Sequence, residues 1–161
     1  SNLGLAFNFL YTLQGREPDP ECVRAMDVAF ILHADHELNA STFAARVTAS
    51  TKADIYSAVT SAIGTLKGPL HGGANREVMN MLEEIGSPEK AKDWVLERLD
   101  EKVKIPGFGH RVYRCEDPRA GVLRRYVQQA AAAAGDMRPL DVAREVEEAM
   151  LNHSKVFPNV D

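Results

Sequence analysis

Residues 19–37 read DPECVRAMDVAFILHADHE, and this stretch decides the fold class. Asp19-Pro20-Glu21 supplies a helix cap, a proline at the first helical position and an acidic first turn. Apolar residues then recur at helical spacing, and the later turns are apolar nearly all round. The pattern predicts a buried helix that carries the polar stretch 33–37 into the interior or onto the wall of a cleft.

Start and stop signals of the same kind recur along the rest of the chain, whereas strand signals are scarce. We expect further helices over about 41–49, 54–67, 71–86, 87–99, 118–135 and 139–150. Residues 104–119, KIPGFGHRVYRCEDPR, interrupt the periodicity with two glycines and two prolines, which predicts a loop. The sequence therefore predicts an all-α fold.

Length and charge limit the classes of function. A chain of 161 residues with 45% hydrophobic residues is long enough for one compact soluble unit. Its net charge of -4 gives no general attraction to nucleic acid or an anionic membrane. The sequence has neither a membrane-spanning apolar run nor a signal-peptide pattern in its first thirty residues, and Cys22 and Cys115 lie far apart in sequence. We therefore expect a cytoplasmic protein with free thiols.

The segment HADHE, residues 33–37, places His33 and His36 three residues apart, so that on a helix they share one face. A zinc site is one interpretation. However, a metalloprotease helix spaces its histidines four apart with a glutamate next to the first. The residues alone favour a hydrogen-bonded core or cap cluster, and we expect no metal site.

The segment KGPLHGGAN, residues 67–75, places His71 at the expected start of a helix, before two glycines that let a ligand approach the backbone. A helix N-terminus presents free amides and a partial positive charge, which disfavours an imidazolium ion. We therefore expect a neutral hydrogen-bond donor suited to a developing enolate. A histidine that only caps a turn fits the residues equally well.

The segment GFGHRVYR, residues 107–114, combines glycines with His110, Arg111 and Arg114. Exposed backbone amides and guanidinium groups are what a phosphate or carboxylate ligand requires. The segment is not a dinucleotide fingerprint, because no strand is expected before it. By itself it is also compatible with a solvated basic turn.

The motifs HADHELNAS (33–41), GPLHGGAN (68–75), PGFGHRVYR (106–114) with DPR (117–119), and PNVD (158–161) together resemble the citrate synthase family in order and spacing. The resemblance runs from about Leu3 to Asp161. It includes relatives that use propionyl-CoA to make 2-methylcitrate. It implies a multihelical homodimer with two domains, in which residues 1–70 are the end of the large domain and residues 71–161 are most of the small domain.

Family members are acyltransferases that condense oxaloacetate with acetyl-CoA to give citrate and CoA, with acetyl-CoA as a substrate and no cofactor. The resemblance implies that His71 hydrogen-bonds the acetyl carbonyl oxygen, that Asp161 removes the methyl proton, and that His110 polarises the oxaloacetate ketone. It further implies that oxaloacetate is held by His36 and Arg119, and CoA by Arg114, Pro106, Gly107, Phe108 and Gly109.

The resemblance also implies a fragment, because complete members are more than twice as long. We expect the isolated chain to be inactive, since it ends at the proposed base and lacks the later arginines that clamp oxaloacetate. Two alternatives stay open, which are a 2-methylcitrate synthase and a non-catalytic helical interaction module of the same fold. Ala44, Ala45, Val59 and Ile63 give the helices over 41–66 apolar faces that predict a dimer or larger species.

Overall fold

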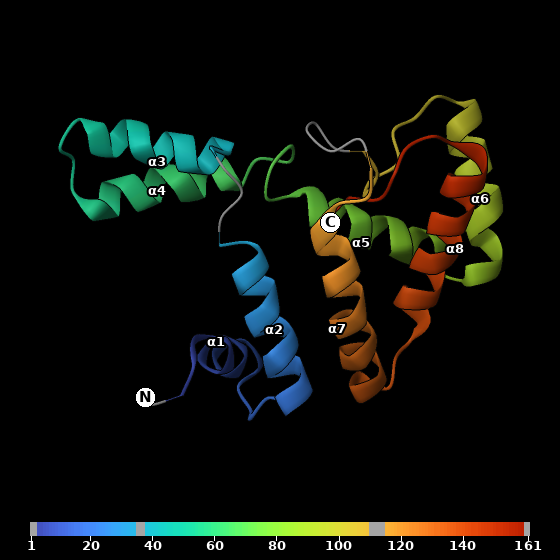
Figure 1. Cartoon of the computed structure of the whole chain (residues 1–161), viewed down its shortest axis with the longest axis horizontal. Coiled ribbons are helices and arrows are strands. Elements are labelled where there is room, and N and C mark those ends of the chain that lie inside the picture. The colour runs from blue at the N-terminus through green and yellow to red at the C-terminus, as the bar shows by residue number, and fades with distance from the viewer. Residues whose placement is uncertain (1–2, 35–37, 110–114, 160–161) are drawn as a thin grey trace.

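A computed structural model of the protein describes residues 3–34, 38–109 and 115–159. These residues form eight helices and no extended strand, which confirms the all-α prediction (Figure 1). The helices are α1 (Leu5–Gln14), α2 (Pro20–Leu32), α3 (Ala40–Ser50), α4 (Ile55–Leu66), α5 (Ala74–Ile85), α6 (Pro88–Asp100), α7 (Pro118–Ala134) and α8 (Arg138–His153). In the described part of the chain, no helix combines the length and apolar character needed to cross a bilayer.

Most helix boundaries follow the capping signals in the sequence. Asp19, Asp54 and Asp117 precede α2, α4 and α7, and each carboxylate accepts a hydrogen bond from a backbone N–H of the first turn. Gly86 and Gly135 end α5 and α7 in the left-handed conformation, with φ of 71° and 74°. These local signals explain why the predicted boundaries agree with the structure within a few residues.

Helix α1 is the one described helix that the sequence analysis did not anticipate. Its N-cap is Gly4, which has no side chain to cap the free amides, and the first turn carries no acidic residue. The usual start signal is therefore missing. Only the stop is recognisable, because Gly15 follows the helix with φ of 67°.

The prediction that the helix over 19–32 is buried was wrong for the chain as described. No residue of α2 is fully buried, and the side chain of Ile31 is 65% exposed. The helix packs against α1 and α7 only, with the Phe9 and Phe30 rings in edge-to-face contact. Its apolar circumference therefore exceeds the surface that these two neighbours cover.

The hydrophobic core lies among α5, α6 and α8, on the right of Figure 1. Its buried members are Met81, Leu82, Ile85, Ala91, Val95, Ile105, Phe108, Val142, Val146, Ala149 and Met150. Ile105 and Phe108 come from the glycine-containing loop after α6, so this loop is anchored in the core. The predicted domain boundary near residue 70 stays a prediction.

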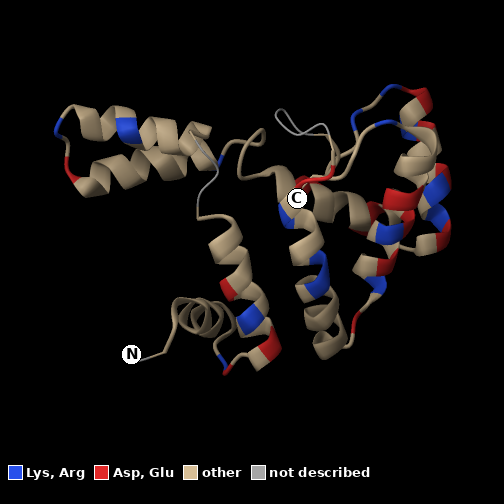
Figure 2. Ribbon diagram, viewed as in Figure 1, with Lys and Arg blue, Asp and Glu red and all other residues tan. Residues whose placement is uncertain are grey.

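Helices α3 and α4 form a hairpin that contacts no other helix of the described chain and projects to one side (Figure 1). The two helices are joined by a hydrogen bond of 2.8 Å between the hydroxyl groups of Thr48 and Ser61. Figure 2 shows few charges on the hairpin compared with α6 and α8. Large apolar side chains are exposed on it, with Phe43 56% exposed and Ile63 60% exposed.

Candidate active site

His71 is held by the first turn of α3. The backbone N–H of Ser41 donates to Nε2 of His71 over 3.3 Å, and the Ser41 hydroxyl oxygen lies 2.9 Å from the same nitrogen. That hydroxyl is also 2.8 Å from Oδ1 of Asn39, the N-cap residue of α3. The Ser41 N–H that donates to Nε2 favours the tautomer with the ring proton on Nδ1, whereas the single hydroxyl proton of Ser41 goes either to Asn39 or to Nε2. Nδ1 is the ring nitrogen that Ser41 does not contact.

The expected position of His71 at a helix start needs a correction. Helix α5 begins at Ala74, and His71 lies in the preceding turn, where its carbonyl accepts from the Ala74 N–H. The turn is tight, because the Gly72 N–H donates to the Leu66 carbonyl over 2.9 Å. The helix N-terminus that reaches the imidazole is that of α3, which supplies the Ser41 N–H. The sequence analysis correctly predicted a helix N-terminus beside His71, but it assigned that N-terminus to the helix that follows His71 instead of to α3.

The glycine loop is paired with the segment that follows α8. The Gly109 N–H donates to the Phe157 carbonyl over 2.8 Å, and the Asn159 N–H donates to the Gly107 carbonyl over 2.9 Å. These bonds flank an antiparallel bridge between Phe108 and Pro158. At this type of bridge the central residues exchange no backbone hydrogen bonds, so proline is tolerated at 158.

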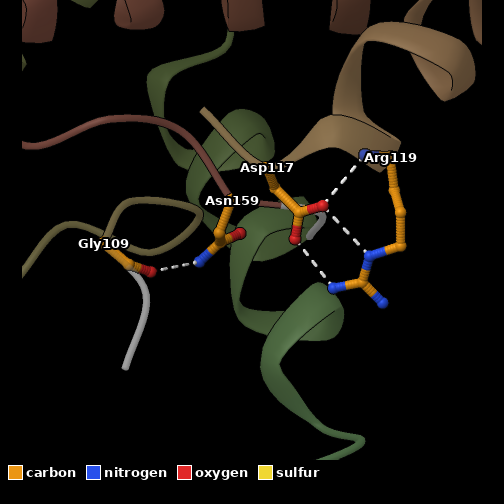
Figure 3. A network of polar contacts seen from close by, with 4 residues as sticks. All are labelled: Gly109, Asp117, Arg119 and Asn159. Carbon is orange, nitrogen blue, oxygen red and sulfur yellow. Dashed lines mark hydrogen bonds and ion pairs between the residues drawn. The ribbon is translucent and has the colours of Figure 1, made fainter. Parts of the chain in front are cut away.

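The side chain of Asn159 adds a third bond to this pairing, which we call the clasp (residues 107–109 and 157–159). Its Nδ2 donates to the Gly109 carbonyl over 3.0 Å (Figure 3). Gly107 and Gly109 have φ of 81° and 82°, a conformation that favours glycine. A Cβ atom at Gly109 would also lie 3.3 Å from Cγ1 of Val156. The glycines are therefore required by the backbone of the clasp.

A cavity of about 250 Å³ adjoins the clasp between α5, α7 and α8. Pro106, Gly107 and Phe108 form part of its wall, together with Pro158 and Asn159. The rest of the lining is mostly apolar, except for Arg144 and for Arg124 of α7, which reaches Glu147 of α8 over 2.8 Å. Three of the five loop residues predicted to bind CoA thus border this cavity, and a fourth, Arg114, lies outside the described residues.

Arg119 is paired with Asp117, which is the one charged side chain fully buried in the described chain. Asp117 accepts from the Arg119 backbone N–H over 2.9 Å, from Nε over 3.0 Å and from Nη2 over 2.7 Å (Figure 3). The carboxylate therefore caps α7 and fixes the plane of the guanidinium group. The sequence analysis named Arg119 but missed Asp117, although the DPR motif contains both residues.

The other predicted residues have different outcomes. His33 lies at the end of α2, where Nδ1 donates to the Ala29 carbonyl over 2.7 Å, and this supports the capping interpretation. No group of three possible metal ligands occurs within the described ranges. His36, His110, Arg114 and Asp161 lie outside the described residues. Their assignments stay predictions.

Comparison with known proteins decides the family. The family model "Citrate synthase, C-terminal domain" matches residues 1–161. The chain belongs to the citrate synthase family. Citrate synthase 2 of Bacillus subtilis is 52% identical to it over 158 residues, which are 98% of this chain and 42% of that protein. We therefore interpret this site in terms of the transferase chemistry of the family.

Two further relatives extend the comparison. A 2-methylcitrate synthase of Mycobacterium tuberculosis is 47% identical over 161 residues, or 41% of its length. The citrate synthase of Thermoplasma acidophilum, solved as a ternary complex with carboxymethyl coenzyme A and oxaloacetate, matches with a TM-score of 0.86 and 34% identity. That match covers 99% of this chain and 43% of the other. The chain thus spans less than half the length of each of these three relatives.

Proposed function

We propose that this chain supplies catalytic residues to an enzyme that condenses oxaloacetate with acetyl-CoA to give citrate and CoA. The proposal rests on the hydrogen bond at His71, whose Nε2 accepts from the Ser41 N–H. The arrangement leaves Nδ1–H to donate to the acetyl carbonyl oxygen. Because this donor is positioned before the reaction, it stabilises the enolate as negative charge develops.

A base must act together with this donor. A thioester methyl group is a weak acid at neutral pH, so a carboxylate removes its proton only when the carbonyl oxygen is stabilised. Asp161 is the proposed base, and His110 is the proposed donor to the oxaloacetate ketone. Both lie outside the described residues and follow the two halves of the clasp in sequence. This chemistry requires no cofactor.

The proposed substrate contacts use the charged pair and the loop. Arg119, oriented by Asp117, and His36 bind the oxaloacetate carboxylates. A planar guanidinium group binds a carboxylate through parallel hydrogen bonds, and the buried pair with Asp117 fixes its orientation. Arg114 and the backbone of 106–109 bind CoA, since the loop borders an apolar cavity and contains glycines that allow close approach.

The test replaces His71 in a full-length enzyme carrying this chain, made by exchanging the matching stretch of the Bacillus subtilis relative for it. His71→Ala should lower kcat by about a hundredfold or more, with a smaller effect on oxaloacetate affinity. His153→Ala, at the exposed end of α8, is the matched control. CoA release that is unchanged in His71→Ala would remove this histidine from the mechanism.

A second candidate is 2-methylcitrate synthesis from propionyl-CoA. The 47% identity with the Mycobacterium tuberculosis 2-methylcitrate synthase favours it. One methylene group changes binding by only about 1–3 kcal/mol, so both thioesters are plausible substrates for the same residues. The ratio of kcat/KM for acetyl-CoA and propionyl-CoA decides between the two, and a ratio below one assigns the second function.

The proposed assembly is a homodimer formed through the α3–α4 hairpin. The hairpin exposes Phe43, Val47, Val59 and Ile63, each by about half or more, and contacts no other described helix. Apolar side chains gathered on a helix pair that no other described helix contacts are typical of a protein–protein interface. Ile63→Glu should shift the chain toward monomer in light scattering. Leu151→Glu on α8, which is 48% exposed, should not. A clean monomer before any substitution would contradict the dimer.

The proposed compartment is the cytoplasm. Cys22 and Cys115 are both free thiols, and Cys115 is exposed. Thiols of this kind persist in a reducing compartment. Labelling of Cys115 by a thiol reagent in intact and in lysed cells tests the location, because a surface-exposed protein would react before lysis.

A further inference from the structure

The clasp brings together two segments whose catalytic residues are far apart in sequence. Asn159 and Gly109 are 50 residues apart, yet both polar groups of the Gly109 backbone are bonded to the segment after α8. Its N–H donates to Phe157, and its carbonyl accepts from the Asn159 side chain. The Gly109 carbonyl belongs to the peptide that leads into His110. Asn159 therefore fixes the orientation of that peptide plane.

Asn159 also lies two residues before Asp161. Its backbone N–H is bonded to the Gly107 carbonyl, so the same residue ties the end of the chain to the loop by main chain and side chain together. Without the side-chain bond, two backbone bonds would still hold Gly107 and Gly109. The Gly109 carbonyl would then lose the hydrogen bond that orients it, at a residue with φ of 82° and no Cβ to restrict its backbone.

We infer that Asn159 is a positioning residue that fixes the Gly109 carbonyl, directly before His110 in sequence, against the segment that leads to Asp161. The inference rests on the proposed function, in which His110 and Asp161 act on the two substrates in one step. Carbon–carbon bond formation requires the enolate and the ketone at close and defined separation, and a displacement of about an ångström costs on the order of a hundredfold in rate. The proposed oxaloacetate contacts, His36 and Arg119, are other residues. Loss of the Asn159 amide should therefore lower turnover more than oxaloacetate affinity.

The geometric part is tested in the chain itself, without any activity. A carbonyl that accepts a hydrogen bond resonates downfield in ¹³C spectra. The Gly109 carbonyl should therefore move upfield in Asn159→Ala. Asn152→Ala is the matched control, since Asn152 is an exposed asparagine on α8. An unmoved Gly109 resonance in Asn159→Ala would overturn the proposed contact, whatever the enzyme does.

The functional part is tested in the full-length enzyme carrying this chain. Asn159→Ala should lower kcat by at least about tenfold, while the oxaloacetate dissociation constant changes by less than about threefold. Asn159→Asp keeps the shape but places a carboxylate against the Gly109 carbonyl, so its loss should be equal or greater. Asn152→Ala should behave as the unsubstituted enzyme.

Two results would overturn the inference. The first is an Asn159→Ala enzyme with kcat within about threefold of the unsubstituted enzyme. The second is a loss of kcat accompanied by parallel losses of oxaloacetate affinity and melting temperature, which would indicate a general structural role. If the unsubstituted enzyme itself released no CoA from acetyl-CoA and oxaloacetate, the proposed function would fail instead. The Gly109 resonance is measured in the chain itself, so failure of the proposed function can be distinguished from failure of the Asn159 contact.

Discussion

The buried Asp117–Arg119 pair can be separated from ordinary helix capping, because the chain contains a matched pair of caps. Asp19 and Asp117 are both followed by proline, and each accepts from the backbone N–H two residues later, over 2.8 and 2.9 Å. Asp19 is exposed, and the residue from whose backbone N–H it accepts is Glu21. Asp117 is buried and also accepts two bonds from the Arg119 side chain. The variants Asp19→Ala and Asp117→Ala therefore differ by burial and by the bonds that Asp117 makes besides its cap, which include the ion pair with Arg119.

The expected magnitudes follow from that difference. Loss of an N-cap costs about 1 kcal/mol of unfolding free energy, which is the whole effect expected at Asp19. Removing one partner of a buried ion pair costs about 3–5 kcal/mol, because water cannot readily replace the lost charge. The Arg119 side chain is only 13% exposed, so little solvent is available to replace the carboxylate. Asp117→Ala should therefore lose about 2–4 kcal/mol more than Asp19→Ala.

Urea unfolding followed by far-ultraviolet circular dichroism measures both losses on the same chain. The dependence of the unfolding free energy on urea should stay constant, which shows that the same surface is exposed in each variant. Losses for Asp117→Ala and Asp19→Ala that agree within about 0.5 kcal/mol would refute the reasoning, because the ion pair would then contribute nothing beyond the cap.

Two further predictions concern α5 and the turn that precedes it. Hydrogen bonds from the indole of Trp94, the single tryptophan, and from a neighbouring arginine lower the pKa of Glu84 below its ordinary 4.5. The stabilisation from this contact is fully present above pH 4.5 and is lost as the pH falls through the lowered pKa of Glu84. Indole fluorescence should therefore change over that pH range, and Glu84→Gln should abolish the transition. At Gly72 a Cβ would lie 2.5 Å from the Leu66 carbonyl oxygen, so Gly72→Ala should cost about 1–3 kcal/mol in urea unfolding. Gly64→Ala, with nothing within 4 Å of the added atom, should be neutral or stabilising, and equal losses at both glycines would contradict this.

The sequence predicted those parts of the fold that depend on local signals. The caps at Asp54 and Asp117 and the stop at Gly86 act within one helical turn, so each is legible in a short stretch. Helix α1 lacks such a start signal. The burial of α2 was overestimated because burial depends on the neighbours available, and among the described helices only α1 and α7 contact it.

The candidate site was predictable as a set of motifs but not as a geometry. His71 is hydrogen-bonded by Ser41, which lies 30 residues earlier, and no periodicity in the sequence relates the two residues. The clasp joins Gly109 to Asn159 across 50 residues, through a loop that has no strand pattern. Such long-range contacts depend on how the helices pack. The motifs nevertheless contained Ser41, Asp117 and Asn159, so the quoted stretches included the partners as well as the residues that received roles.

The most direct test of the account is CoA release by the full-length enzyme carrying this chain, with and without Asp161→Asn. The substitution keeps the shape of the proposed base and removes its ability to take a proton. The account predicts CoA release that requires oxaloacetate and acetyl-CoA together and that falls by about a hundredfold or more in Asp161→Asn. A folded enzyme that releases no CoA, or an Asp161→Asn variant with unchanged turnover, would contradict the claim that these motifs form a citrate-forming site.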